Sequence, residues 1–333
     1  MTETKIARPP RALLLAAFAA VYLAWGSTYA AIRIAIDTMP PLLMAGARFL
    51  LAGTLLYAIM RLRGEPAPER RHWKNTALIG MLLLMFGNGG VTMAETTVPS
   101  AIVALLVAMV PMWMVLLEWL RPGGTRPTGR TLLGLVIGFA GIVLLVGPGS
   151  LAGGERVNPL GAGIVTVGAM AWAFGSIWSR SAALPKNALV ATGMEMAWGG
   201  VWLLLAGTLR GELGALDPSA FTTASVLAYF YLVVVGSLVG FSAYIWLLGV
   251  STPARVSTYA YVNPVVAVLL GWAMLDEPLS ARVIAAAAII VAAVAVITMG
   301  KRPQAAPVAA AESAKAVEEG AGEAARVGRR SAA

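Results

Sequence analysis

Long apolar runs, separated by short polar segments, dominate this chain. A helix needs about 20 apolar residues to cross the ~30 Å hydrocarbon core of a bilayer. Ten runs of this kind can be read, at residues 12–32, 42–60, 75–94, 98–119, 129–147, 160–180, 188–208, 223–248, 254–273 and 281–299. The pattern predicts an all-α integral membrane protein with ten transmembrane helices.

The composition fits the same class. Hydrophobic residues make up 59% of the chain and charged residues 12%, and the mean hydropathy is +0.78. These values exclude an ordinary soluble domain, which carries about 25% charged residues. The basic segment 1–11 and the apolar run after it resemble a secretory signal, but the run is too long for one and lacks a cleavage site. We expect an uncleaved first helix.

The positive charges orient the predicted helices. With the N-terminus in the cytoplasm, 20 of the 25 Lys and Arg residues fall on the cytoplasmic side, and the opposite side holds only Arg33, Arg156, Arg210 and Arg282. This asymmetry follows the positive-inside rule and places both termini in the cytoplasm. We therefore interpret the net charge of +9 as that of a multi-pass inner (plasma) membrane protein in contact with lipid, and not of a nucleic-acid binder.

The two halves of the chain contain related segments. Residues 87–128 and 240–280 align at an offset of 153. The matched pairs are Gly87 and Gly240, Pro111 and Pro264, and Trp119 and Trp272. Ordered pairs at one offset indicate an internal repeat.

Each half has five predicted helices, so the second copy would enter the membrane upside down. Inverted repeats of this kind are typical of secondary transporters, which bind substrate near the midplane between the repeats. We expect one repeat over residues 12–150 and another over 158–300. A disordered cytoplasmic tail, residues 301–333, would follow.

A proline lies near the middle of one helix in each repeat, Pro111 in the first and Pro264 in the second. Each removes the hydrogen bond to the carbonyl four residues earlier, at Val107 and Ala260 respectively. Lipid cannot satisfy such a carbonyl, so both sites must face protein or a water-lined cavity. We predict that the two prolines form related parts of a gate.

Aromatic and amide side chains on these helices are the candidates for the wall of a central cavity. The first helix carries Tyr22, Trp25, Gly26, Tyr29 and Arg33 on one stripe. The full predicted set is Tyr22, Trp25, Tyr29, Asn88, Trp113, Trp172, Tyr244, Tyr259 and Asn263. For each one, core packing or a place in an aromatic belt remains an alternative.

Two charges fall well inside predicted helices, away from the ends, Arg48 in the second and Glu195 in the seventh. Intramembrane charges usually face the bundle interior and are functional or structurally paired. The inverted topology puts them in opposite leaflets, so we do not expect a direct salt bridge. Glu195 is the candidate proton site, with a structural hydrogen bond as the alternative. Glu277 is expected to cap the last helix, whose N-terminal dipole favours an acid.

Several motifs resemble those of a known family, the drug/metabolite transporter superfamily, and within it the ten-helix exporters built from two EamA-type repeats. The motifs are W-G-S at 25–27, A-R-F at 47–49, P-x-W at 111–113, Y-x-N-P-V-x-A-x-L-L-G-W at 261–272 and L-D-E-P-L-S at 275–280. The resemblance covers residues 13–299 and is closer in the second repeat. In the first, Gly123, Gly124 and Thr125 stand where the second has Asp276, Glu277 and Pro278.

The resemblance implies an exporter of small metabolites such as amino acids, proton-coupled or facilitative, that works by alternating access. The aromatic and methionine content points to the aromatic amino-acid and methyl viologen exporters, with organic cations as further substrates. No cofactor or metal is implied, and we expect a monomer or weak oligomer. The substrate and the coupling ion stay open.

Two other function classes were considered. A passive metabolite channel would differ from a transporter only in its kinetics. An intramembrane enzyme needs histidine, cysteine or clustered acids. The chain has no cysteine, and its only histidine, His72, falls in a basic loop. We therefore predict no catalytic residue.

Overall fold

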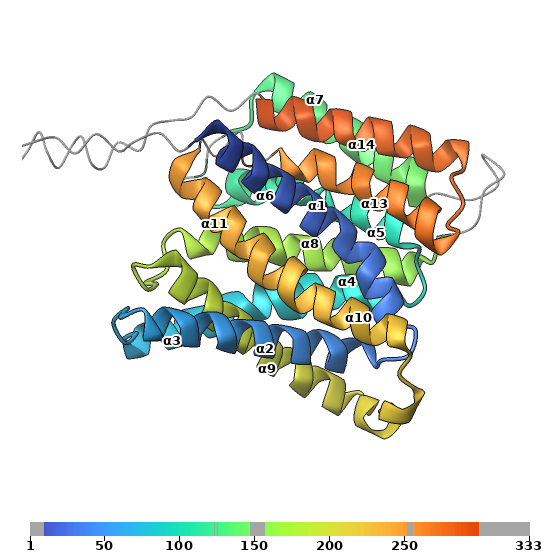
Figure 1. The fold of residues 1–333 in the computed structure, drawn as a ribbon. Helices are drawn as coiled ribbons and strands as arrows, with labels where there is room; N and C mark the ends of the chain where they lie inside the picture. Colours follow the sequence, from blue (N-terminus) through green and yellow to red (C-terminus); the bar gives the residue numbers. More distant parts are fainter. Residues whose placement is uncertain are drawn as a thin grey trace, which may run out of the picture. The chain divides into compact units, whose positions relative to one another are not determined.

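A computed structural model describes residues 10–122, 124, 126–146, 157–251, 256 and 258–299 of the chain. Over these residues the first half forms five helical segments (Figure 1). They are α1 (Arg11–Ala35), α2 (Pro41–Leu62), the run α3–η1–α4 (Arg70–Gly80, Met81–Asn88, Gly89–Ala94), the broken helix α5–α6 (Ser100–Val107, Val110–Leu120) and α7 (Gly129–Val146).

The second half repeats this order within the described residues. Its segments are α8 (Pro159–Ser179), α9 (Ala188–Leu209), the run α10–η5–α11 (Thr223–Tyr231, Leu232–Val239, Gly240–Val250), α13 (Tyr259–Leu275) and α14 (Ala281–Met299). Two short 3₁₀ turns, η3 (Glu212–Ala215) and η4 (Pro218–Ala220), follow α9. The predicted tail, 301–333, and most of the predicted N-terminal segment lie outside the described residues.

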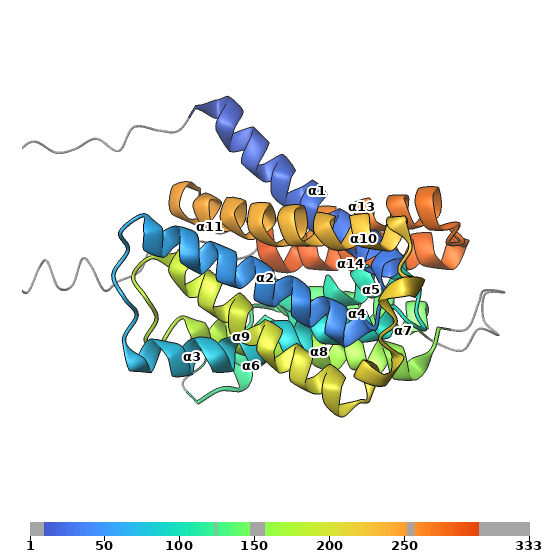
Figure 2. The same cartoon turned by 60° about the horizontal axis from the view of Figure 1, so that its bottom comes forward.

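The ten predicted apolar helices are confirmed. Seven segments have the length and composition to cross a membrane, and three shorter apolar helices correspond to α7, α13 and α14. Large apolar side chains remain exposed on the outward faces, including Val136 on α7 and Leu160 and Val167 on α8. Exposed faces of this kind suit hydrocarbon and not water. The first half of α1 leans away from the other helices (Figure 2).

The helices of the two halves pack reciprocally. α1 packs on α13 and on α10–η5–α11, while α8, its counterpart, packs on α5–α6 and on η1–α4. α2 runs beside α9, and α7 beside α14, in both ribbon views. α1 begins and α14 ends at the same end of the bundle, which we call the near end; the opposite end is the far end (Figure 1).

Small residues allow α2 and α9 to approach closely. Side-chain atoms added at Gly53 would meet the backbone of Ala197, and those added at Gly200 would meet the backbone of Leu50. Contacts between small residues are a common way for helices to associate in lipid, where no hydrophobic force drives them together. This pair joins the two halves along most of its length.

Two π-helical segments occupy equivalent places in the halves. η1 and η5 each contain eight residues, and both interrupt the third helix of their half. These π-helical segments were not predicted from the sequence. A π-helical turn holds one more residue than an α-helical turn, and such segments often occur at functional sites. Here each ends beside the central cavity described below.

Carboxylates of the second half cap helices of the first half at the far end. The Glu277 carboxylate accepts hydrogen bonds from the backbone N–H groups of Ser100, at 2.6 Å, and Ala101, at 3.0 Å, at the start of α5. Glu212 accepts from the N–H groups of Leu42, at 2.9 Å, and Leu43, at 3.0 Å, at the start of α2. Both helices thus have otherwise unpaired N–H groups satisfied across the repeat boundary.

The prediction that Glu277 caps the last helix is wrong. The preceding residue, Asp276, has a left-handed φ of 53°, which turns the chain before Glu277. The carboxylate then lies over Gly271, where an added Cβ would be only 2.5 Å from the Glu277 Oε2 atom. α14 is capped instead by Ser280, whose Oγ accepts from the Val283 N–H at 3.3 Å.

We expect Glu277→Gln to destabilise the protein. An amide offers one acceptor oxygen and no charge to the two N–H groups, so the loss should be about 1–3 kcal/mol of unfolding free energy. The apparent melting temperature of the detergent-purified protein measures this. Glu118→Gln is the matched control, because Glu118 forms an i,i+3 pair with an exposed Arg121. Such pairs contribute about 0–1 kcal/mol. Equal melting temperatures for the two variants would contradict the cap.

Candidate functional site

A cavity lies between the two halves of the bundle. Its volume is about 120 Å³, and both halves contribute to its wall. α1, α2, η1, α4 and α5–α6 line it from the first half, and α8, η5, α11 and α13 from the second. The volume is several times that needed by one ordered water molecule, so a small solute or several waters can enter.

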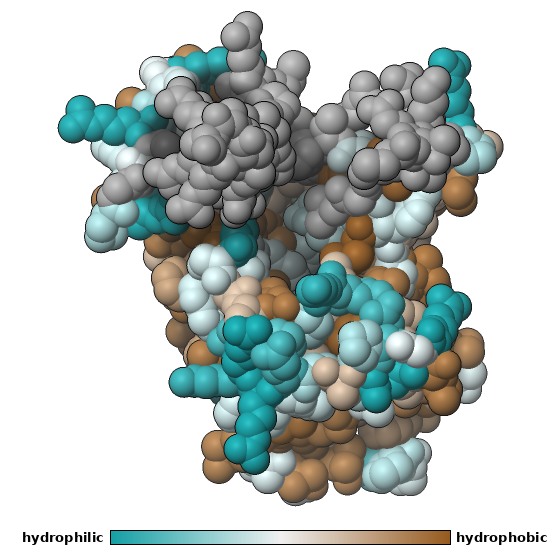
Figure 3. All heavy atoms as spheres, turned by 90° about the vertical axis from the view of Figure 1, so that its left-hand side faces the viewer, coloured by the Kyte–Doolittle hydropathy of each residue, from teal (hydrophilic) through white to brown (hydrophobic). Residues whose placement is uncertain are grey.

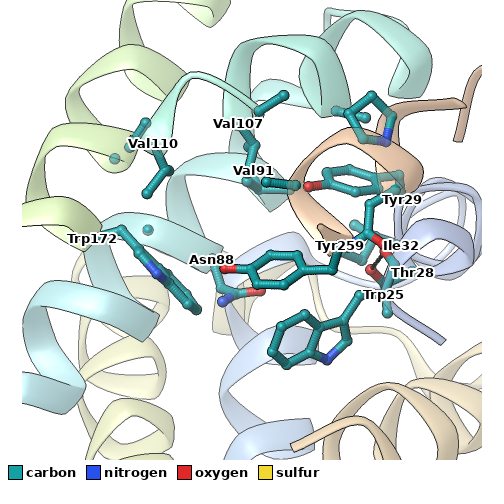
Figure 4. Close-up of a pocket in the computed structure, with 18 of the residues that line it drawn as sticks. Trp25, Thr28, Tyr29, Ile32, Asn88, Val91, Val107, Val110, Trp172 and Tyr259 are labelled. Carbon is teal, nitrogen blue, oxygen red and sulfur yellow. Dashed lines mark hydrogen bonds between the residues drawn. The ribbon is translucent and has the colours of Figure 1, made fainter. Parts of the chain in front are cut away.

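Most of the predicted binding residues surround this cavity. Those that line it are Trp25, Tyr29, Asn88, Trp172, Tyr259 and Asn263, together with Arg48, Pro111 and Pro264. Figure 4 shows the rings of Tyr29 and Tyr259 extending toward the side of Asn88 and Val91, with Trp172 across the space. The sequence therefore located the wall, although a binding role for each residue remains a prediction.

Three predicted residues do not line the cavity. The Tyr22 hydroxyl hydrogen-bonds to the Thr258 hydroxyl just before α13. Trp113 packs edge-to-face on Phe139, at 5.4 Å between ring centroids, within the core between α6 and α7. Tyr244 packs behind the wall against Trp25, at 5.1 Å. These positions are those of packing residues, the alternative that the sequence analysis left open.

Trp25 is the centre of an aromatic cluster on one side of the cavity. Its ring lies 5.3 Å from that of Phe241 and 5.2 Å from that of Tyr259, both in edge-to-face geometry. Its indole N–H donates to the Gly236 carbonyl at 3.3 Å. An added Cβ at Gly240 would meet the indole nitrogen at 2.5 Å. The ring is thus held on several sides, and it connects α1 to η5, α11 and α13.

Asn263 joins α13 to α1 beside this cluster. The side chain is buried. With its amide nitrogen directed at the two nearest carbonyls, it donates to Tyr22 at 3.3 Å and to Tyr259 at 3.2 Å. The residue also lines the cavity. The residue couples the wall mechanically and can also accept a hydrogen bond from a solute.

The two prolines are placed differently in their helices. Pro264 lies inside the continuous helix α13. Pro111 lies in the first turn of α6, after a break that ends α5 at Val107. A proline in the first turn costs no helix hydrogen bond. Val107 and Ala260, the predicted unpaired carbonyls, both belong to residues that line the cavity.

Arg48 is the one charged residue among the described cavity-lining residues. It is 3% exposed, and its Nε atom donates to the Ser237 hydroxyl of η5 at 3.0 Å. The guanidinium group also lies 4.5 Å from the centre of the Phe49 ring. Within the described part of the chain no carboxylate forms a salt bridge with it, and none was expected with Glu195. A positive charge therefore faces the cavity with donor capacity to spare.

Glu195 lies away from the cavity. It is on the side of α9 that meets α3, and its backbone carbonyl packs against Gly80. It does not line the cavity, and no hydrogen bond to its side chain is found among the described residues. Its predicted role in proton coupling therefore stays a prediction, without support from proximity to the cavity.

Glu95 is a buried acid, which was not predicted from the sequence. It follows α4 directly, and it is fully buried with both carboxylate oxygens lacking a hydrogen-bond partner in the described residues. The Arg33 guanidinium donates to the Glu95 backbone carbonyl at 2.6 Å. Its burial could not be read from the sequence, because Thr96 and Thr97, the next two residues of the same turn, are exposed.

Comparisons with known proteins agree with this architecture. Residues 11–147 and 159–299 each match the EamA-like transporter family. The chain is 43% identical over 301 residues to the uncharacterized inner membrane transporter YedA of Escherichia coli K12, covering 89% of this chain and 95% of that protein. It is 24% identical to the uncharacterized transporter YvbV of Bacillus subtilis, covering 88% and 93%.

The fold also resembles that of a solved structure. It superposes with a TM-score of 0.55 at 21% sequence identity and covers 88% of this chain and 100% of the other. That structure is described only as a crystal structure of protein. At this identity the likeness extends to the fold alone.

We expect Ser237→Ala to lower stability, because it leaves the buried Arg48 guanidinium without an acceptor. Loss of a partner to a buried charge costs about 2–5 kcal/mol. Thermal unfolding in detergent would measure the change. Thr208→Ala is the control, since that hydroxyl is exposed and only bonds back to its own helix at Leu204. If both variants melt with the wild type, Arg48 does not depend on Ser237.

Proposed function

The chain belongs to the EamA-like transporter family, and on that premise we propose that it exports small metabolites, chiefly aromatic or other apolar amino acids, as a secondary-active or facilitative transporter. The observation that carries the proposal is the cavity between the halves, with aromatic walls and one buried arginine. Family membership makes the protein a transporter and not an enzyme.

We propose an inverted-repeat arrangement with both termini in the cytoplasm. The reciprocal packing of the two five-helix halves supports the repeat, and the shared near end of α1 and α14 supports an even number of crossings. Hydrophilic side chains gather at the near end (Figure 3). Exposed basic residues there include Arg61, Arg70 and Arg180. The near end would then be cytoplasmic, by the positive-inside rule, and the membrane the inner membrane, as for YedA.

The cavity chemistry favours a substrate that carries a carboxylate. Arg48 offers a positive charge in a site shielded from water, where charge-assisted hydrogen bonds are strong. Trp25, Trp172 and Tyr259 offer apolar and aromatic area for a side chain. An apolar amino acid satisfies both. Organic cations, which the resemblance also suggested, would meet repulsion from Arg48 and are the weaker candidates.

Alternating access needs the ends of the bundle to part in turn. Pro111, at the α5–α6 break, and Pro264, inside α13, would allow α6 and α13 to bend beside the cavity. At the far end, Glu212 and Glu277 tie the halves together. At the near end, the position equivalent to Glu277 is Gly124, and a side chain there would collide with the Glu118 carbonyl. We infer that this conformation is closed at the far end.

A competition panel on purified, reconstituted protein tests the proposal. We expect phenylalanine uptake into proteoliposomes to saturate and to show trans-stimulation. Tryptophan and leucine should compete, while phenethylamine and methyl viologen should compete poorly. Flux that never saturates would instead indicate a passive channel, and no flux of any amino acid would reject the substrate class.

We expect Arg48→Gln to weaken phenylalanine transport selectively. Loss of one charge-assisted interaction of about 1.5–3 kcal/mol raises the KM by about 10–150-fold. Phenethylamine has the same ring and no carboxylate, so its residual transport or inhibition should not weaken. The ratio of the two KM or inhibition constants separates recognition from a general loss of folded protein. A parallel loss for both compounds would remove Arg48 from the site.

We expect Asn263→Ala to slow transport while the protein still folds. The amide bridges α1 and α13 and faces the cavity, so its loss should lower kcat and raise KM together. Proteoliposome kinetics measure both values, and size-exclusion chromatography in detergent checks folding. Asn187→Ala, at the cap of α9 and outside the cavity lining, is the control. Unchanged kinetics for Asn263→Ala would exclude it from the site.

A further inference from the structure

Glu95 lies between the cavity and the far end of the bundle. Its N–H donates to the carbonyl of Val91, a cavity-lining residue one turn earlier. Two other cavity residues, Tyr29 on α1 and Arg48 on α2, interact electrostatically with its carboxylate. Glu95 therefore lies next to the cavity wall, on the side of the far end.

We propose that Glu95 is a proton-binding site whose occupancy is linked to closure of the far end. The proposal deepens the transport function and rests on alternating access. In it, a proton from water on the far side binds the carboxylate when the far end is open. The neutral acid is then sealed as that end closes, and the proton leaves by way of the cavity.

The surroundings of Glu95 contain four charged or titratable groups that act on its carboxylate. They are Arg33 and Tyr29 from α1, Arg48 from α2, and Glu277 from the turn after α13. Arg33 is bound to the backbone carbonyl of Glu95, and Arg48 to Ser237. Glu277 is occupied with the start of α5. The three charged neighbours therefore each have a partner other than the Glu95 carboxylate.

The Glu95 carboxylate accepts no hydrogen bond from any described residue in this closed arrangement, although the residue is 0% exposed. Removing an ionised carboxylate from water costs several kcal/mol unless hydrogen bonds replace the lost hydration. The free-energy cost of burying a neutral carboxyl group is much smaller. Closure of the far end should therefore favour the protonated acid, and loss of the proton should favour opening, which admits water to the charge.

The charged neighbours of Glu95 connect it to both halves of the chain. Arg33 and Arg48 belong to the first half, but Ser237, the partner of Arg48, belongs to η5 in the second. Glu277 also belongs to the second half and holds α5 of the first. Parting of the halves at the far end would change the contacts of Arg48 and Glu277 together, and with them the field at Glu95.

The absence of native cysteines allows a direct test that requires no known substrate. Ala104 lines the cavity from α5 and is buried, so Ala104→Cys reports opening. Ser219, exposed in the far-end turn η4, becomes the reference through Ser219→Cys, which corrects for the pH dependence of thiol reactivity. A membrane-impermeant thiosulfonate is added outside right-side-out vesicles between pH 6 and pH 8, and the two labelling rates are compared.

The expected result is that the ratio of the Ala104→Cys rate to the Ser219→Cys rate falls several-fold from pH 8 to pH 6. With Glu95→Gln added, the ratio should be low and independent of pH, and Glu95→Asp should restore the dependence. Glu195→Gln and Glu118→Gln are matched controls, and both should keep the dependence on pH, because among the residues described neither contacts Glu95 or the far-end caps.

Three results would overturn the proposal. They are a ratio that does not change with pH in the otherwise native chain, a dependence that survives Glu95→Gln, and a ratio that rises as the pH falls. The last would mean that the charged form closes the far end by pairing with Arg33 or Arg48. Because labelling requires no substrate, failure of phenylalanine transport would reject the proposed function while leaving this result to be judged separately.

Discussion

Every polar backbone group inside a bilayer must find its partner within the protein, because hydrocarbon offers none. In this structure that constraint determines where the two halves touch. The first N–H groups of α2 and α5 are satisfied by Glu212 and Glu277, which come from the other half. Helix ends that would otherwise require water are thus used to join the repeats. The broken helix α5–α6 and the proline in α13 meet the same constraint by opening onto the cavity.

The same requirement explains the polar content of the site. The Asn263 amide nitrogen donates to two backbone carbonyls, and the Arg48 guanidinium donates one hydrogen bond to Ser237. Both residues line the cavity, where they are set among aromatic rings. Few polar groups with fixed directions in an apolar space are typical of small-molecule sites. The scaffold and the binding wall therefore share residues, and a change to one alters the other.

Much of this could be predicted from the sequence, because hydrophobic run length reflects bilayer thickness directly. The ten helices were predicted in that way, and Trp25, Asn88 and Pro264 were predicted to line the cavity as aromatic, amide and proline residues within them. Tyr22, Trp113 and Tyr244 were placed on the cavity by residue type, but their direction depends on helix rotation, which one sequence does not determine. The cap that Glu277 provides joins residues more than 170 positions apart, and a single sequence does not show such a contact. The burial of Glu95 depends on how the helices pack around it, which the sequence does not show either. The π-helices η1 and η5 were also not predicted from the sequence, although glycines lie within and next to both segments.

Gly124 stands where the second half has Glu277, and an added side chain there would collide with the Glu118 carbonyl in this conformation, so that position supplies no charged cap. A symmetric inverted repeat would populate its two closed forms equally. Here one form has an extra charged cap, and a difference of about 1.5–3 kcal/mol corresponds to a bias of about 10–150-fold between the two populations. The empty transporter would then mostly occupy the conformation described here, with the far end closed. Substrate binding would have to supply the free energy that reverses this preference. The free energy used in this way would not contribute to the observed affinity, so the residue at position 124 would influence both affinity and turnover.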